Sequence, residues 1–295
     1  MLTSFISLYI AATMPPDIIP QEELTPSTFD ISELLSTKTL EPVKDPLFIS
    51  PIIEAKSSIS IDMASDKILF EKNAHERLPI ASITKLMTLT IVTEENDPTE
   101  VVTISNYAAN IEGSQMYLRA GEQISLENLL YGAIIHSAND AAVALAEHNA
   151  GSVDAFVEKM NKKAQEFGLE NTNYSNPIGL DDYNNYSSSY DIAILSKHIY
   201  QNQFVRHAAK LKELEVKSVD GTYSHLLQST NALLGNEYLN IKGLKTGKTD
   251  GAGLCLVAVA ETDTGNEIIT VVLNSPDRFY ETKILVDWIF RAYTW

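Results

Sequence analysis

Residues 81–88 read ASITKLMT, and this stretch decides the fold. It opens a segment, residues 84–93, that is apolar on every side and carries little charge. A helix without a solvated face is buried, so we expect a buried helix here. Ser82 and Lys85, three residues apart, share one face of it. A serine becomes an effective nucleophile when a base takes its proton, and a buried lysine with a lowered pKa can be that base. On its own, S-x-x-K is also common on ordinary helices.

A second polar string, SAN at residues 137–139, falls between two predicted helices at 125–135 and 141–149. The hydroxyl of Ser137 can relay a proton to a leaving amine, and the amide of Asn139 can hold a backbone carbonyl of a peptide. Taken alone, the string is equally well explained as helix capping, with Asp140 as the cap of the second helix.

The third string is KTGKT at residues 245–249, just before predicted strands at 254–261 and 268–273. Lys245 places a positive charge, and Thr246 a hydrogen-bond donor, beside the edge of that strand pair. Glycines allow the backbone of a ligand to lie close to such an edge. Taken alone, the string is a glycine-rich turn.

The order of the three strings is more informative than any one of them. S-x-x-K, a serine–asparagine string and K-T-G form a signature of β-lactamases and penicillin-binding proteins. From about residue 52 to residue 293, the sequence resembles the serine-type D-alanyl-D-alanine carboxypeptidases, which are low-molecular-mass penicillin-binding proteins. The loop 168–180, with NPIGL at its end, and the pair Arg278 and Glu281 also resemble that family.

The resemblance implies a reaction and a set of roles. Ser82 is expected to attack the carbonyl between the two terminal D-alanines of a peptidoglycan stem peptide, with Lys85 as base, and water then hydrolyses the acyl-enzyme. Backbone amides of Ser82 and Lys248 would form the oxyanion hole. The other expected site residues are Ser137 for proton transfer, Asn139 for peptide orientation, Lys245 for electrostatic support, Thr246 and Arg278 for the terminal carboxylate, and Thr249 for substrate binding. No cofactor or metal is expected, and β-lactam antibiotics are expected as covalent inhibitors.

The predicted fold class is α+β and β-lactamase/transpeptidase-like. A hairpin at residues 57–70 and the late strands would form one antiparallel sheet, packed with helices that include residues 154–167 and 280–293, around an inserted helical region. Residues 1–46 are expected to be an apolar N-terminus followed by a proline-rich acidic tether, and residues 47–295 the catalytic domain. We expect no C-terminal β-domain or anchor, so any membrane attachment would come from the N-terminus.

The net charge, the apolar N-terminus and two single residues lead to further expectations about partners, location and local structure. The net charge of −17 argues against nucleic acid as a partner. The apolar residues 1–13 suggest an export signal or anchor, hence an extracytoplasmic location, although a plain hydrophobic terminus is the alternative. Cys255 is expected in the core. Tyr190 stands where the family often has arginine, so the sequence leaves open how the segment 188–191 is anchored and whether it takes part in recognition of the substrate carboxylate.

Two other functions remain open from the sequence. A β-lactamase on the same scaffold would need a glutamate that holds the deacylating water, and no E-x-x-L-N string is present after the second motif. A non-catalytic peptidoglycan-binding protein would not need the complete set of catalytic side chains.

Overall fold

A five-stranded antiparallel sheet, in the order β3-β2-β10-β9-β8, joins the two ends of the described chain. The computed structural model describes residues 41–295, so the predicted apolar terminus and most of the tether lie outside the described residues. The strands are β2 (Ser57–Asp62), β3 (Ile68–Lys72), β8 (Asn240–Thr249), β9 (Gly253–Glu261) and β10 (Glu267–Ser275). The sheet confirms the predicted α+β class and the pairing of early with late strands.

Alternation along the strands explains how the sheet is covered on both faces. In β9, Cys255, Val257 and Val259 belong to the core shared with the helical region, whereas Leu256 and Ala258 pack against the C-terminal helix. Successive side chains of a strand point to opposite faces, so an uninterrupted apolar run serves two cores at once. Cys255 is fully buried, as predicted.

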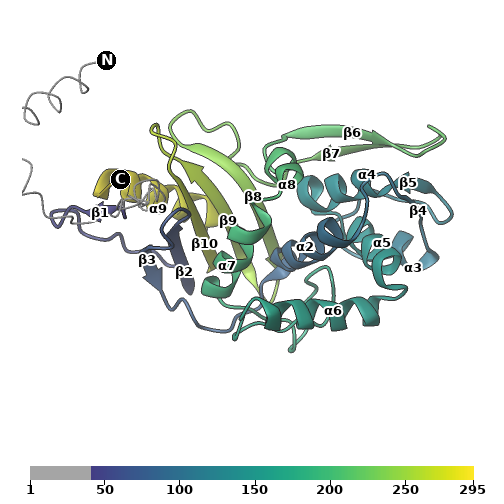
Figure 1. The fold of residues 1–295 in the computed structure, drawn as a ribbon, viewed down its shortest axis with the longest axis horizontal. Helices are drawn as coiled ribbons and strands as arrows, with labels where there is room; N and C mark the ends of the chain where they lie inside the picture. The colour runs from purple at the N-terminus through teal and green to yellow at the C-terminus, as the bar shows by residue number, and fades with distance from the viewer. Residues whose placement is uncertain (1–40) are drawn as a thin grey trace, which may run out of the picture. The chain divides into compact units, whose positions relative to one another are not determined.

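Most helices gather beyond the β8 edge of the sheet, while α7 packs on one face of the sheet and α9 on the other (Figure 1). Their bounds are α2 (Lys85–Glu95), α3 (Asn106–Ala109), α4 (Leu126–Tyr131), α5 (Asn139–Ala150), α6 (Val153–Glu166), α7 (Ser189–Ile199), α8 (Gln203–Ala208) and α9 (Arg278–Ala292). A 3-10 turn, η1 (Ala81–Thr84), precedes α2, and a π-helical turn, η2 (Gly132–His136), extends α4. Three two-stranded sheets complete the fold: β1 (Val43–Lys44) with β11 (Tyr293–Thr294), β4 (Val101–Thr103) with β5 (Gln123–Ser125), and β6 (Glu213–Lys217) with β7 (Ser224–Gln228).

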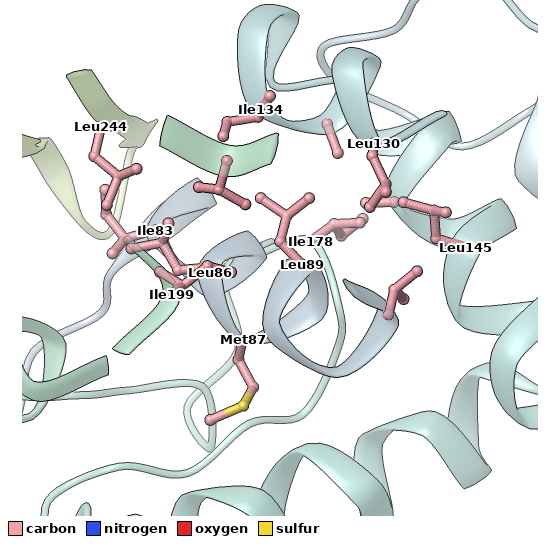
Figure 2. Close-up of a cluster of buried hydrophobic side chains, with 14 of the residues drawn as sticks. Ile83, Leu86, Met87, Leu89, Leu130, Ile134, Leu145, Ile178, Ile199 and Leu244 are labelled. Atoms are coloured by element: carbon pink, nitrogen blue, oxygen red, sulfur yellow. The ribbon is translucent and has the colours of Figure 1, made fainter. Parts of the chain in front are cut away.

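Helix α2 lies in the middle of the core, as the absence of a solvated face predicted. Every residue from Lys85 to Val92 is buried. Figure 2 shows apolar side chains of α2 and η1 among those of α4, η2, α5, α7, β8 and the loop before α7; the labelled set is Ile83, Leu86, Met87, Leu89, Leu130, Ile134, Leu145, Ile178, Ile199 and Leu244. Fully burying one such side chain contributes about 1.5–3 kcal/mol, so the start of α2 is held firmly.

Three local predictions need correction. The KTGKT string precedes the strand pair β9 and β10, as expected, but it forms the end of the edge strand β8 and is not a glycine-rich turn. Asp140 does not cap α5; its carboxylate instead accepts hydrogen bonds from the backbone N–H groups of Met116 and Leu118, both at 3.1 Å. The helix predicted over 125–135 leaves α geometry after Tyr131 and ends at Ser137, whose φ is 61°.

The N-terminal boundary of the domain remains a prediction. The described chain already pairs with its C-terminal end at Val43 and Lys44, just before the expected start at residue 47. Within residues 41–295, no helix is both long and apolar enough to cross a bilayer.

Candidate active site

The pair Ser82 and Lys85 lies where the 3-10 turn passes into α2. Ala81, just before Ser82, has φ at 48°, a left-handed conformation that L-residues rarely adopt and that occurs often at functional sites. The amine Nζ of Lys85 lies 2.9 Å from Oγ of Ser82. It also lies 2.7 Å from Oδ1 of Asn139 and 2.8 Å from the carbonyl oxygen of Ile178. The side chain of Lys85 is therefore fixed by three oxygens from three separate segments.

These contacts suit a neutral amine. Asn139 Oδ1 and Ile178 O can only accept hydrogen bonds, so they take two N–H groups of Lys85. In a neutral amine the remaining position is a lone pair, and it faces the hydroxyl of Ser82. Burial is the main reason that the pKa of Lys85 lies well below its usual value; nearby Lys245 lowers that pKa further, and Asp140 opposes part of the shift. The lysine can therefore accept the serine proton.

A second lysine–serine pair lies close enough for its lysine to act electrostatically on Lys85. Lys245 on β8 donates to Oγ of Ser137 at 2.7 Å and to its neighbour's carbonyl, Thr246 O, at 3.0 Å. Burial, and then the charge of Arg278, lower the pKa of Lys245 to about 7. Near neutral pH this lysine is therefore partly neutral and partly charged, so it can either supply or accept a proton in a network that includes Ser137.

Asn139 connects the base to a loop that the sequence left unassigned. Its Oδ1 accepts from Lys85, its Nδ2 donates to the carbonyl of Glu112 at 2.7 Å, and its backbone N–H donates to Ser114 O at 2.6 Å. A Cβ on Gly113 would lie 2.6 Å from Asn139 Nδ2, so only glycine lets the loop approach this closely. The role of Asn139 in orienting a peptide stays a prediction, while its role in holding Lys85 is visible in these contacts.

Thr246 and Arg278 lie at the β8 side of the site. Thr246 Oγ1 is 2.5 Å from Oγ1 of Thr230, a residue that the sequence analysis did not identify. Arg278 starts α9 behind the sheet and donates to the carbonyls of Gly247 at 2.6 Å and, more weakly, Cys255 at 3.5 Å. The guanidinium is thus brought to the strand that carries KTG.

Lys248 and Thr249 occupy the end of β8. Lys248 is exposed. The hydroxyl of Thr249 donates to Asp181 at 2.6 Å and accepts from the backbone N–H of Ala252 at 3.0 Å. The contact with Asp181 holds the end of β8 against the loop 176–182, and the contact with Ala252 closes the turn between β8 and β9. The substrate-binding role of Thr249 stays a prediction.

The loop 176–182 makes contacts with the site that sequence reasoning missed. It delivers the carbonyl of Ile178 to Lys85, and Asn176 Oδ1 accepts backbone N–H bonds from Ile178, Gly179 and Leu180. Gly179 has φ at 84°, and a Cβ there would overlap Ala81 O. The NPIGL string was a signal of the loop, but no residue pattern reveals which carbonyl meets the lysine.

Tyr190 and Asp191 lie in the segment that differs from the family pattern, and their contacts show how this segment is anchored. The ring of Tyr190 packs on His75 with centroids 4.6 Å apart, and its N–H bonds to the carbonyl of Ala74 at 3.0 Å. Asp191 accepts from the backbone N–H of Asn171 and the hydroxyl of Thr172, each at 2.7 Å. The aspartate therefore anchors the loop, while the tyrosine packs against residues 74–75.

The fold and the two lysine–serine pairs place the chain first in the β-lactamase/transpeptidase-like class. Comparison with known proteins narrows this further. The D-alanyl-D-alanine carboxypeptidase family matches residues 45–277, and the chain belongs to that family.

Relatives and solved structures agree with this assignment. D-alanyl-D-alanine carboxypeptidase DacF of Bacillus subtilis is 37% identical over 257 residues, which cover 81% of this chain and 63% of DacF. The structure of penicillin binding protein 5 from Haemophilus influenzae has a TM-score of 0.75 at 37% identity, covering 81% of this chain and 72% of that one. The Streptomyces K15 DD-transpeptidase has a TM-score of 0.77 at 28% identity, covering 82% of this chain and 99% of that one. The chain thus spans a little under two thirds of the length of DacF.

Proposed function

We propose that this chain is a serine-type D-alanyl-D-alanine carboxypeptidase that removes the terminal D-alanine of peptidoglycan stem peptides. The observation that carries the proposal is the amine of Lys85, held by two obligate acceptors so that its third position faces Ser82 Oγ at 2.9 Å. Such a fixed base next to a serine is the arrangement that nucleophilic catalysis requires.

The reaction begins with transfer of the Ser82 hydroxyl proton to Lys85 and attack of Oγ on the carbonyl carbon of the penultimate D-alanine. The tetrahedral oxyanion is stabilised by the backbone N–H groups of Ser82 and Lys248. As the C–N bond breaks, Ser137 gives its proton to the departing amine and is reprotonated with the proton that Lys85 took from Ser82, which leaves Lys85 neutral again. Lys85 then deprotonates a water molecule that attacks the ester carbonyl, and it returns that proton to Ser82 Oγ as the ester C–O bond breaks.

The charges of the cleft support the choice of a substrate with a free carboxylate. Lys245 and Arg278 place positive charge at the β8 side, and Thr246 supplies a hydroxyl there. A terminal carboxylate is the group that such a surface binds, and β-lactams, which carry one, would acylate Ser82 in the same way. We infer an extracytoplasmic location, because stem peptides lie on that side of the membrane, and a catalytic domain of residues 47–295.

The test is intact-protein mass spectrometry after benzylpenicillin treatment, combined with D-alanine release from a D-Ala-D-Ala peptide. The expected result is one penicilloyl adduct and slow loss of it, with efficient D-alanine release. Ser82→Ala should lose both signals, whereas Ser50→Ala, at an exposed serine outside the site, should keep them. Lys85→Ala should acylate ~10²–10⁴ times more slowly.

Each alternative outcome points elsewhere. Rapid turnover of benzylpenicillin would identify a β-lactamase. Absence of both adduct and D-alanine release in the unaltered protein would identify a binding protein. An adduct that persists in Ser82→Ala would show that another residue is the nucleophile.

A further inference from the structure

Thr230 lies at the β8 side of the site, and none of the motifs or reaction steps described above gives it a role. Its Oγ1 is 2.5 Å from Oγ1 of Thr246, so the two hydroxyl groups share a hydrogen bond. Thr230 is exposed, whereas only 4% of the surface of Thr246 is accessible. The pair therefore joins a solvent-accessible hydroxyl to a buried residue on the strand that carries KTG.

The segment 229–231, which follows β7, holds Thr230 in place through its backbone. The N–H of Thr230 donates to the carbonyl of Ile135 in η2 at 3.3 Å. The N–H of Ser229 donates to the carbonyl of Lys212, before β6, at 2.7 Å. Backbone contacts thus bring Thr230 to β8, and its hydroxyl is left to contact the neighbouring threonine.

The hydrogen bond between the two threonines can run in either direction in the free protein. Each hydroxyl has one proton to donate and two lone pairs that accept. A carboxylate only accepts, so under the proposed function Thr246 must donate its single proton to the carboxylate of the substrate. The short contact between the two oxygens is then favourable only if Thr230 is the donor. An anionic ligand therefore fixes the order, with Thr230 donating to Thr246 and Thr246 donating to the carboxylate.

This chain of two hydrogen bonds strengthens the binding of the anion. A hydroxyl that accepts a hydrogen bond is polarised and becomes a better donor, and a bond to a carboxylate is charge-assisted. Within residues 41–295, Thr230 is the only hydrogen-bond partner of Thr246 Oγ1. The proton of Thr230 is therefore what orients the Thr246 hydroxyl.

We propose that Thr230 is a positioning residue for carboxylate recognition, because its hydroxyl turns that of Thr246 toward the carboxylate of the departing D-alanine. The inference rests on the proposed function and adds a residue to it. Thr230 acts through Thr246 and takes no part in bond breaking, so its effect falls on the binding of substrates that carry the carboxylate.

The test measures how strongly the protein depends on a free carboxylate. It compares Nα,Nε-diacetyl-L-Lys-D-Ala-D-Ala, the acid substrate, with Nα,Nε-diacetyl-L-Lys-D-Ala p-nitroanilide, whose leaving group has no carboxylate. Thr230→Val keeps the shape of the side chain without its hydroxyl. It should lower kcat/KM for the acid substrate about two- to ten-fold, the effect of one net hydrogen bond, through a higher KM. The anilide should be cleaved at the same rate as by the unaltered protein, and Thr230→Ser should restore normal cleavage of the acid substrate.

A second measurement, on the acid substrate alone, asks whether Thr230 acts through Thr246. Thr246→Val removes the group that donates to the carboxylate. Adding Thr230→Val to it should cause no further loss of kcat/KM, because the two residues form one chain. Losses that multiply in the double variant would show that Thr230 contacts the substrate independently, and they would overturn the positioning role.

A matched control is Thr294→Val, at an exposed threonine on β11 outside the site, which should cleave both substrates normally. Normal cleavage of the acid substrate by Thr230→Val, or an equal loss with both substrates, would overturn the inference and leave the carboxypeptidase intact. If the unaltered protein releases no D-alanine from the acid substrate, the proposed function fails, and this inference fails with it.

Discussion

Gly179→Ala tests whether the loop 176–182 holds Lys85, the proposed catalytic base. Gly179 has φ at 84°, so an alanine there costs roughly 1–2 kcal/mol in backbone conformation alone. Its Cβ would also overlap Ala81 O and lie 2.9 Å from the backbone nitrogen of Ser82. Forcing an extra methyl group into a packed position costs about 1–3 kcal/mol more, for a total of about 2–5 kcal/mol. At about 2–4 °C per kcal/mol for a domain of this size, we expect the melting temperature to fall by about 4–20 °C.

Gly168→Ala is the matched control. Gly168 also has a left-handed φ, at 66°, but a Cβ there meets nothing within 4 Å. It should therefore show the conformational cost without the overlap, so that Gly179→Ala is less stable than Gly168→Ala by about 1–3 kcal/mol.

The decisive assay is the acylation rate by a fluorescent penicillin, measured well below both melting temperatures. Relief of the overlap should move the loop and carry Ile178 O away from Lys85, which it now contacts at 2.8 Å. A displacement of about 1 Å near reacting groups can cost about 10²-fold, so we expect acylation of Gly179→Ala to slow about ten- to hundred-fold, with Gly168→Ala near normal. If both variants acylate equally fast, the loop does not position the base and the reasoning fails.

Three further predictions follow from other contacts. Acylation should rise with pH and level off well below pH 10.5, because only neutral Lys85 is a base and burial lowers its pKa; a rate still rising at pH 10 in a stopped-flow series would contradict this. Asp181→Ala should slow acylation several-fold while changing the free energy of unfolding by less than about 1 kcal/mol, since its bond to Thr249 is exposed; an unchanged rate argues against the loop's role. Glu122→Leu should cost about 1–3 kcal/mol in urea unfolding, because it strips a partner from buried His225 at 2.7 Å, and replacing both by leucine should recover part of that; simple additivity of the two single losses would refute the coupling.

The sequence predicted the elements whose periodicity is strong. The buried helix after Ser82 and the apolar late strands could be located because their side chains follow one pattern over a whole element. The strand that carries Lys245 could not, since its lysines and glycines at 242–248 hide the alternation, and only pairing with β9 reveals it.

The site was predictable as a set of residue types and only partly as a set of contacts. Ser82 and Lys85 meet as their spacing predicted, whereas the contact between Ser137 and Lys245 was not predicted. The carbonyl of Ile178 could not be foreseen, because a backbone acceptor leaves no mark on side-chain identity. Thr230 was equally hidden, as a threonine in an unpatterned segment acquires meaning only when the fold brings it to Thr246.

The oxygens around Lys85 have a practical consequence for studies of folding. They come from residues 82, 139 and 178, which are remote in sequence, so the base exists only in a chain whose helical region and loops have all assembled. A covalent penicillin label would therefore count correctly assembled molecules one by one. A compact intermediate with native helices but loose packing would stay unlabelled, and the rate at which labelling capacity returns after dilution from urea would time the last step of folding.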